Sequence, residues 1–170
     1  MNILSARRYV STRKCALTPD EAETRRIAYA LKLPAGADED FKRAGAELAA
    51  LVNSPCVLVP VPDCRGGTVV NCRLCQAIAD NLGPACRVKD CLYRVTPIQS
   101  QCERHRARLG PLPAAAHGIR RYKNAMFDVS IPVYCVDNVV TSGNTLAACR
   151  MVISTARGLV FADAYSTWQK

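Results

Sequence analysis

The sequence lacks any long apolar run and any pattern of a cleavable leader. None of its 170 residues lies in a stretch approaching the roughly 20 apolar residues that a membrane helix needs. The basic N-terminal segment has no apolar stretch after it, so we expect no secretory signal. Internal repeats and the patterns of Ser-His-Asp hydrolases, zinc proteases and Walker-type ATPases are also absent. These absences predict a cytoplasmic protein without a membrane partner.

Acidic residues are scarce, with 14 Asp and Glu against 23 Lys and Arg and a formal net charge of +9. This excess predicts an anionic partner, and nucleic acid, a phosphorylated metabolite and an anionic surface all qualify. The hydrophobic content of 49% and charged content of 22% are ordinary for a globular protein, which excludes disorder as the main state. The length corresponds to about one domain.

The ten cysteines are scattered along the chain, and their share stays below the roughly 8–10% typical of disulfide scaffolds. Several lie inside apolar strand or helix patterns, which predicts free thiols in a reducing compartment. Cys72 and Cys75 have the spacing of a metal or redox pair. Both also fall three residues apart on an expected helix, where two buried thiols are the simpler interpretation. The sequence leaves open whether these two cysteines bind a metal.

Apolar periodicity predicts alternating strands and helices. Thr18 to Glu21 form a capping box with Pro19 at the first helical position, and Asp38 is expected to cap a second helix. We expect helices at 18–33, 38–52, 68–81 and 145–156, a short helix within 99–109, and strands at 56–61, 87–93, 132–136 and 159–164. The pattern predicts an α/β fold with a parallel, Rossmann-like sheet flanked by helices. We expect 1–55 to be a helical N-terminal extension packed on a main domain at 56–170.

The segment from Val133 to Thr145 places an acidic residue and a hydroxyl-rich turn after a buried strand. Ligands of open α/β sheets bind at the carboxyl ends of the strands, and a helix N-terminus suits a phosphate. Gly143 allows the backbone to approach an anion closely. Asp137 can accept hydrogen bonds from sugar hydroxyls or hold a water of Mg²⁺. Further hydroxyl donors come from Thr141, Ser142 and Thr145.

A second loop, Asp63-Cys64-Arg65-Gly66-Gly67, follows the expected Val-rich strand at 56–61. Arg65 supplies positive charge, and the two glycines permit close approach of an anion to the backbone. An ordinary turn would use the same residues, so this loop alone is a weak signal. Its position upstream of the segment at 133–145, and after a similar strand, strengthens the interpretation as an anion site.

Together the two motifs resemble those of type I phosphoribosyltransferases, and the resemblance covers about residues 56–165. It implies a site for 5-phosphoribosyl 1-diphosphate (PRPP) and Mg²⁺. Asp137 and Asn138 would hold the ribose hydroxyls, and Asp137 would also hold Mg²⁺ through water. The 5′-phosphate would be bound by Thr141, Ser142, Gly143, Asn144 and Thr145. The pyrophosphate group would be bound by Asp63, Cys64, Arg65, Gly66 and Gly67.

Residues 94–124 are polar and basic, with Glu103 as their one acidic residue. The resembled family has a mobile basic hood at this position, which closes on the pyrophosphate and excludes water. The resemblance therefore implies a hood that uses Arg104, Arg106, Arg108 and Lys123, with Asp137 and Arg104 as catalytic residues. From the residues alone, a solvated basic face or a nucleic-acid patch stays open.

Within this family the chain is similar to the ComF/GntX-like branch, through the Val-Pro-Val-Pro sequence at 59–62 and Gln99-Ser100-Gln101 before the hood arginines. It lacks the four-cysteine zinc ribbon of that branch, since only Cys15 precedes residue 56. Asn138 replaces the usual second acidic residue, which implies a reduced affinity for Mg²⁺ and PRPP or a reduced turnover. Thr141 replaces an Asp that assists the base in purine-salvage relatives, and Thr cannot act as a base at neutral pH.

The expected function is therefore that of a pentosyl-transferring glycosyltransferase, a PRPP-dependent phosphoribosyltransferase that releases pyrophosphate and uses Mg²⁺ with an unknown acceptor. The alternative is a catalytically weak PRPP- or nucleotide-binding protein, or a single-stranded DNA-binding protein of ComF-like type in DNA uptake or processing. Asn138 and the net charge of +9 favour this alternative. Apolar sheet edges are compatible with a homodimer, which nothing in the sequence fixes.

Overall fold

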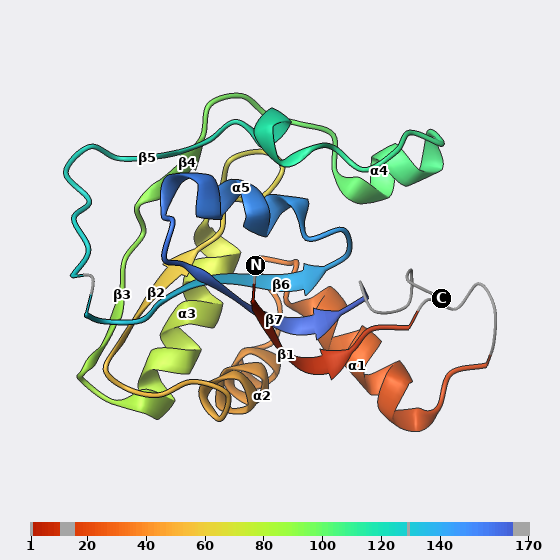
Figure 1. The fold of residues 1–170 in the computed structure, drawn as a ribbon. Helices are drawn as coiled ribbons and strands as arrows, with labels where there is room; N and C mark the ends of the chain where they lie inside the picture. The colour runs from red at the N-terminus through yellow and green to blue at the C-terminus, as the bar shows by residue number, and fades with distance from the viewer. Residues whose placement is uncertain (1, 11–15, 129, 165–170) are drawn as a thin grey trace.

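A five-stranded parallel sheet forms the centre of the computed structural model, which describes residues 2–10, 16–128 and 130–164 (Figure 1). The strands lie in the order β1-β7-β6-β2-β3, and each neighbouring pair is parallel. Their bounds are β1 Ile3–Arg8, β2 Cys56–Pro60, β3 Cys86–Val88, β6 Val133–Val140 and β7 Arg157–Asp163. The predicted α/β class with a parallel sheet flanked by helices is confirmed.

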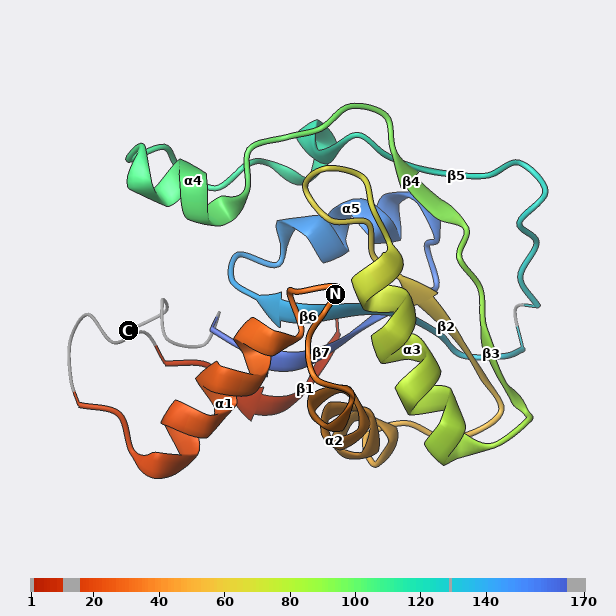
Figure 2. The same ribbon diagram turned by 180° about the vertical axis from the view of Figure 1, so that it is seen from behind.

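Helices cover both faces of this sheet, as an all-parallel sheet requires. On one face lie α1 (Pro19–Ala30), α2 (Asp38–Ala49) and α3 (Val69–Leu82). On the other face lies α5 (Asn144–Val152), and the two views in Figures 1 and 2 show this division. Each face has its own apolar core, one containing Ile27, Leu48 and Phe161 and the other containing Leu146 and Val160.

The local signals at the helix ends are largely confirmed. Thr18 and Glu21 form the predicted capping box, with the N–H of Glu21 donating to Thr18 Oγ1 at 3.3 Å. Helix α3 ends at Gly83, whose φ of 82° lies in the left-handed region that suits glycine. The prediction for α2 was wrong by one residue: Ala37 is the N-cap, and Asp38 is the first helical residue without a side-chain cap.

Two predicted elements differ from the structure. Residues 3–8 form strand β1, which pairs with β7 at the edge of the sheet, so the segment before residue 56 is not wholly helical. The strand predicted at 87–93 is two short strands, β3 and β4 (Leu92–Arg94), which belong to different sheets. In both cases tertiary pairing decides the outcome, which local patterns do not report.

The segment 94–124, which we call the hood, lies over the α5 side of the sheet. Strand β4 pairs antiparallel with β5 (Ile119–Arg121), and between them lie α4 (Gln101–Arg106) and a 3₁₀ helix, η1 (Ala114–His117). Helix α4 projects past the carboxyl ends of β6 and β7 in both views (Figures 1 and 2). Among the residues described, none of the helices has the length and apolar character needed to cross a bilayer.

Candidate functional site

The candidate site lies at the topological switch point of the sheet, between β2 and β6. Strand β2 continues through α3 to β3 on one side, and β6 continues through α5 to β7 on the other. The two strands are neighbours, with Pro60 opposite Val136, and the N–H of Val61 donates to the carbonyl of Val136 at 3.0 Å. Such a switch point is where open α/β sheets bind ligands. The loops that follow β2 and β6 therefore begin side by side.

Asp137 occupies the centre of this crevice, near the end of β6. Its Oδ1 accepts the N–H of Asn138 at 2.8 Å and lies 3.4 Å from Nδ2 of Asn71, in the first turn of α3. The same Asn71 amide donates to the carbonyl of Val61 at 2.7 Å, so it joins the ends of both strands. Burial raises the pKa of Asp137, and the hydrogen bonds from Asn138 and Asn71 oppose this rise. Within the described chain no protein group forms a hydrogen bond with Oδ2, so this oxygen is free to bind a ligand.

Asn138, the other predicted ribose ligand, has its side chain already engaged. Its Nδ2 donates to the carbonyl of Leu31 at 3.3 Å, just after α1, and its Oδ1 accepts the N–H of Val139 at 2.7 Å. A carboxylate could accept the Val139 bond but could not donate to Leu31. The amide at position 138 therefore ties the end of β6 to α1.

The predicted phosphate loop, residues 141–145, surrounds the N-terminus of α5. Gly143 is the N-cap and adopts a φ of 74°, which other residues rarely adopt. In the part of the chain that the structure describes, the N–H groups of Gly143, Thr145 and Leu146 have no acceptor. Exposed donors at a helix N-terminus attract a phosphate. The side chain of Asn144 also donates to the carbonyl of Leu112 at 2.8 Å, which links this loop to the hood.

The predicted pyrophosphate loop, residues 63–67, is a tight turn closed by its own first residue. Asp63 Oδ1 accepts the N–H groups of Arg65 at 2.8 Å and Gly67 at 2.9 Å. The N–H of Gly66, whose φ is 97°, donates to the carbonyl of Asp63 at 3.1 Å. The N–H of Cys64 has no acceptor among the described residues. The Asp63 carboxylate thus occupies two of the backbone donors that an incoming anion would use.

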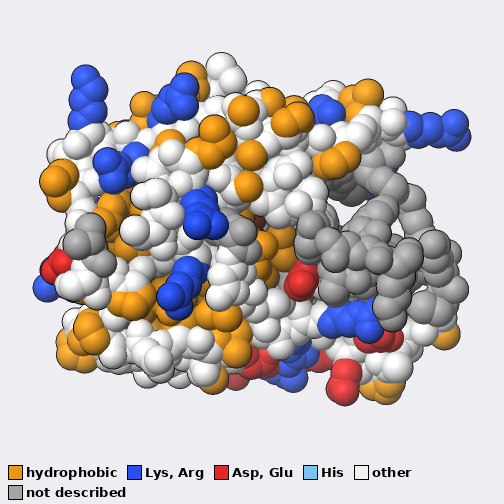
Figure 3. All heavy atoms as spheres, viewed as in Figure 1, with side chains coloured by type: hydrophobic (Ala, Val, Ile, Leu, Met, Phe, Trp, Pro, Cys, Tyr) orange, Lys and Arg blue, Asp and Glu red, His pale blue; other side chains and the backbone are white. Residues whose placement is uncertain are grey.

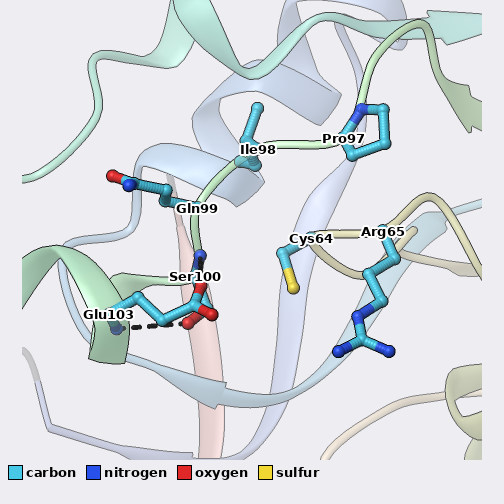
Figure 4. Close-up of a pocket in the computed structure, with 7 residues that line it drawn as sticks. All are labelled: Cys64, Arg65, Pro97, Ile98, Gln99, Ser100 and Glu103. Atoms are coloured by element: carbon cyan, nitrogen blue, oxygen red, sulfur yellow. Dashed lines mark hydrogen bonds between the residues drawn. The ribbon is translucent and has the colours of Figure 1, made fainter.

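A pocket of about 550 Å³ opens between this loop and the start of the hood (Figure 4). The close-up shows Cys64 and Arg65 from the loop facing Ser100 and Glu103 from the hood. The N–H of Ile98 donates to the carbonyl of Cys64 at 2.9 Å and joins the two walls. Ser100 and Glu103 cap α4 reciprocally, and these hydrogen bonds hold the pKa of Glu103 below its usual range. The pocket is lined by Cys64, Arg65, Pro97, Ile98, Gln99, Ser100 and Glu103.

The predicted hood cations form no hydrogen bond or ion pair with either loop in the described chain. Arg104 Nε donates to the carbonyl of Gly110 at 2.9 Å, within the hood itself. Arg106, Arg108 and Lys123 are exposed. Among the described residues, none of these four side chains makes a hydrogen bond or ion pair with residues 63–67 or 141–145. The structure brings the loops after β2 and β6 together, and the role of these cations stays a prediction.

Two other side chains contact the site without any clear signal in the sequence. Asn71 joins Val61 and Asp137, as described above. Arg94 on β4 is buried and contacts the carbonyls of Pro62 and Asp63. Side chains two residues apart on a strand point to the same face. The buried Leu92 on the same short strand is therefore the one indication that Arg94 points inward.

Cys72 and Cys75 do not form a metal site in the described residues. Cys75 is buried on α3, where burial raises the pKa of its thiol, and Cys72 is half-buried. No group of three or more potential His, Cys, Asp or Glu ligands occurs in the ranges that the structure covers. The described cysteines are free thiols.

Comparison with known proteins adds no assignment. No model of a known protein family matches the chain. A search of curated proteins likewise finds no sequence that matches it.

Proposed function

We propose that the protein is a phosphoribosyltransferase that takes the phosphoribosyl group of PRPP, with Mg²⁺, and releases pyrophosphate. One observation carries the proposal: the pairing of β2 with β6, Pro60 opposite Val136. It places an anion-compatible loop at 63–67 beside an acidic strand end and a phosphate-compatible helix N-terminus at 141–145. PRPP carries a phosphate on C5 of its ribose and a diphosphate on C1, so it needs two anion sites flanking a group that binds hydroxyls.

Each of these three parts of the site binds a different group of PRPP. The free N–H groups at the start of α5 bind the 5′-phosphate, together with the hydroxyls of Thr141, Ser142 and Thr145. The open oxygen of Asp137 accepts the ribose hydroxyls. The pyrophosphate extends toward Arg65 and the N–H of Cys64, where positive charge stabilises the developing negative charge on the leaving group.

A magnesium ion fits this arrangement. Mg²⁺ keeps several waters and is commonly held by one or two carboxylates together with substrate phosphates. Asp137 lies between the two loops and has an oxygen without a protein partner in the described chain, so it would hold the ion through water. When bound, the ion neutralises the negative charge of the leaving pyrophosphate.

The charge distribution supports an anionic ligand on this side. In Figure 3 Lys and Arg side chains lie on both halves of this face, including the upper half, where Figure 1 has the hood and α5. Most of the Asp and Glu side chains in that view lie along the lower edge, near α1 and α2. Such a field draws anions toward the hood.

Two contacts favour a second candidate, a PRPP- or nucleotide-binding protein with little turnover. The amide of Asn138 is held by the carbonyl of Leu31, so Asp137 alone serves the ribose. The carboxylate of Asp63 must give up the N–H groups of Arg65 and Gly67 before pyrophosphate can use them. Both features reduce the stabilisation available to a transition state more than they prevent binding.

Release of pyrophosphate from PRPP distinguishes the two candidates. If the protein is an enzyme, it should release pyrophosphate from PRPP in the presence of Mg²⁺ and a suitable nucleophile, and Asp137→Ala should abolish this release. If the protein only binds PRPP, binding should be saturable without release of pyrophosphate, and Asp137→Ala should abolish the binding. Absence of any PRPP binding by the wild-type protein contradicts both.

A further inference from the structure

Arg94 is the one Lys or Arg side chain that the fold buries among the described residues, with 8% of the residue exposed. It lies on β4 beside the buried Leu92 position and opposite the buried Ile119 of β5. Successive strand residues point to opposite faces, so Arg94 and Leu92 share the inner face of the hood. The hood therefore carries a cation on the side that meets the sheet.

The guanidinium of Arg94 is satisfied by backbone carbonyls alone. Its Nε donates to the carbonyl of Asp63 at 2.9 Å, and Nη2 donates to that of Pro62 at 3.3 Å. Nη1 donates to the carbonyl of His117. No ion pair to Arg94 occurs among the residues that the structure covers. The carboxylates of Asp63 and Asp137 stabilise this charge from a distance. Burying a charge without a direct ion pair is costly, which indicates that this position serves more than packing.

These contacts, together with the N–H of Gly66 that donates to the same Asp63 carbonyl at 3.1 Å, fix the direction in which the loop after β2 presents its backbone. The peptide between Asp63 and Cys64 is trans, so its carbonyl and its N–H point in opposite directions. Because the Asp63 carbonyl is held by Arg94, the N–H of Cys64 points away from the guanidinium. Cys64 and Arg65 line the open pocket, and the N–H of Cys64 has no acceptor among the described residues. The result is a free N–H donor in a loop that lines the pocket, with a buried positive charge on the carbonyl side of the same peptide.

We propose that Arg94 is a positioning residue for the pyrophosphate group of PRPP: from behind the loop it turns the N–H of Cys64 toward the anion and adds positive charge there. This inference rests on the proposed function, since it assumes that the anion at this loop is a pyrophosphate. Arg94 itself does not touch the ligand. Burial lowers the pKa of Arg94, but a guanidinium keeps its charge at neutral pH.

The two ends of PRPP provide an internal comparison. Arg94 contacts the loop at 63–67 and makes no contact with 141–145 in the described chain. Pyrophosphate with Mg²⁺ reports on the first loop, and ribose 5-phosphate reports on the second. Titration calorimetry on the full chain measures both affinities for the wild type, Arg94→Gln and Arg94→Lys. Arg120→Gln is the matched control, because Arg120 is an exposed arginine on the same ribbon.

Arg94→Gln should weaken pyrophosphate binding about tenfold or more, with ribose 5-phosphate affinity within about twofold of the wild type. Arg94→Lys keeps the charge but loses the planar fork, so its pyrophosphate affinity should fall between the two. Arg120→Gln should leave both affinities within about twofold. A change in pyrophosphate affinity alone is not what a general loss of folding would produce.

Unchanged pyrophosphate affinity in Arg94→Gln overturns the proposal, and so does an equal loss of both affinities in a folded variant. If circular dichroism shows that Arg94→Gln does not fold, Arg94→Lys decides, and full pyrophosphate affinity in that variant overturns the proposal. A wild-type protein that binds ribose 5-phosphate but not pyrophosphate overturns the role of Arg94 alone. A wild-type protein that binds neither overturns the proposed function itself.

Discussion

Nδ2 of Asn71 lies 3.4 Å from Oδ1 of Asp137, although 66 residues separate the two in the sequence. The same nitrogen is 2.7 Å from the carbonyl oxygen of Val61, so the start of α3 holds the ends of β2 and β6 together. Two strand ends fixed by one side chain make the crevice between them a preorganised site. The position of Asp137 on β6 thus depends on α3, the helix that connects β2 to β3.

Asp137→Asn should separate ligand binding from stability. Burial raises the pKa of Asp137, so above that pKa the ionised carboxylate costs the folded state free energy. An asparagine of the same shape removes this cost, and the melting temperature at pH 7.5 should be equal to or above that of the wild type. Mg²⁺-dependent PRPP affinity should fall about tenfold or more, because the ribose and the ion lose their carboxylate.

The control for this substitution is Asp80→Asn, which neutralises an exposed carboxylate near the other end of α3. It should leave PRPP affinity unchanged. Retention of full PRPP affinity in Asp137→Asn, measured by calorimetry, would show that the proposed site is elsewhere.

Gly143→Ala should weaken binding of ribose 5-phosphate. Gly143 has a φ of 74°, where an alanine is strained by about 1–2 kcal/mol. Its Cβ would meet only Ile3 Cδ1, at 3.8 Å, so backbone strain and not a clash is the main effect. Relief of that strain would shift the free N–H groups of the phosphate loop. Gly83→Ala, at a φ of 82° and a ψ of −174° at the end of α3, carries a larger backbone strain away from the loop.

Both variants should lose stability in urea denaturation, Gly83→Ala more than Gly143→Ala, and only Gly143→Ala should lose ribose 5-phosphate affinity. Equal affinity in the two variants would argue against 141–145 as the phosphate loop.

Gly45→Ala should destabilise the packing of α2 against α3. A Cβ at Gly45 would lie 2.6 Å from the carbonyl carbon of Ala77 and 2.7 Å from its Cβ. The helices would have to separate, which costs about 1–3 kcal/mol or more. Gly110→Ala, whose Cβ would meet nothing within 4 Å, should be close to neutral. Chemical denaturation measures both, and a neutral Gly45→Ala would mean that the two helices are less closely packed than described.

Acid should destabilise the fold through His117 before the carboxylates are protonated. His117 is 1% exposed, and burial together with the nearby charge of Arg94 lowers its pKa. An unfolded histidine titrates near about 6.5, so the unfolded state takes up the proton more readily than the folded state. Stability is therefore complete above this pH and declines as the pH falls from about 7 to about 5.

His117→Gln should flatten this decline in the melting temperature between pH 7.5 and pH 5.5. The carboxylates with lowered pKa values, such as Glu23 and Glu47, lose their contribution only at lower pH. An identical decline in the wild type and the variant would assign the effect to another group.

Much of the fold follows from local patterns in the chain. The capping box at Thr18, the glycine stop at Gly83 and the apolar runs of β2 and β6 each determine an element by short-range physics. Strand β1 does not follow from them, because ILSARR has no continuous apolar run. It becomes a strand by pairing with β7 at the far end of the chain. Likewise β6 continues through Asp137 and Asn138 because β7 pairs with it as far as Val140.

The candidate site shows the same division. The residues of both loops are recognisable because they follow buried strands, and the sheet topology brings them together. The roles of Asn71, Arg94 and the Asn138 amide depend on contacts with residues 31 to 107 positions away. A single sequence contains no local signal for such contacts.

A thermal-melt titration with PRPP, with and without Mg²⁺, tests the central proposal most directly, with ribose 5-phosphate and pyrophosphate measured alongside. A ligand of the folded state at a hundredfold excess over its Kd stabilises it by about 2.7 kcal/mol. PRPP with Mg²⁺ should raise the melting temperature more than either fragment, and removal of Mg²⁺ should reduce the shift. No shift with millimolar PRPP and Mg²⁺ would contradict a PRPP site between β2 and β6.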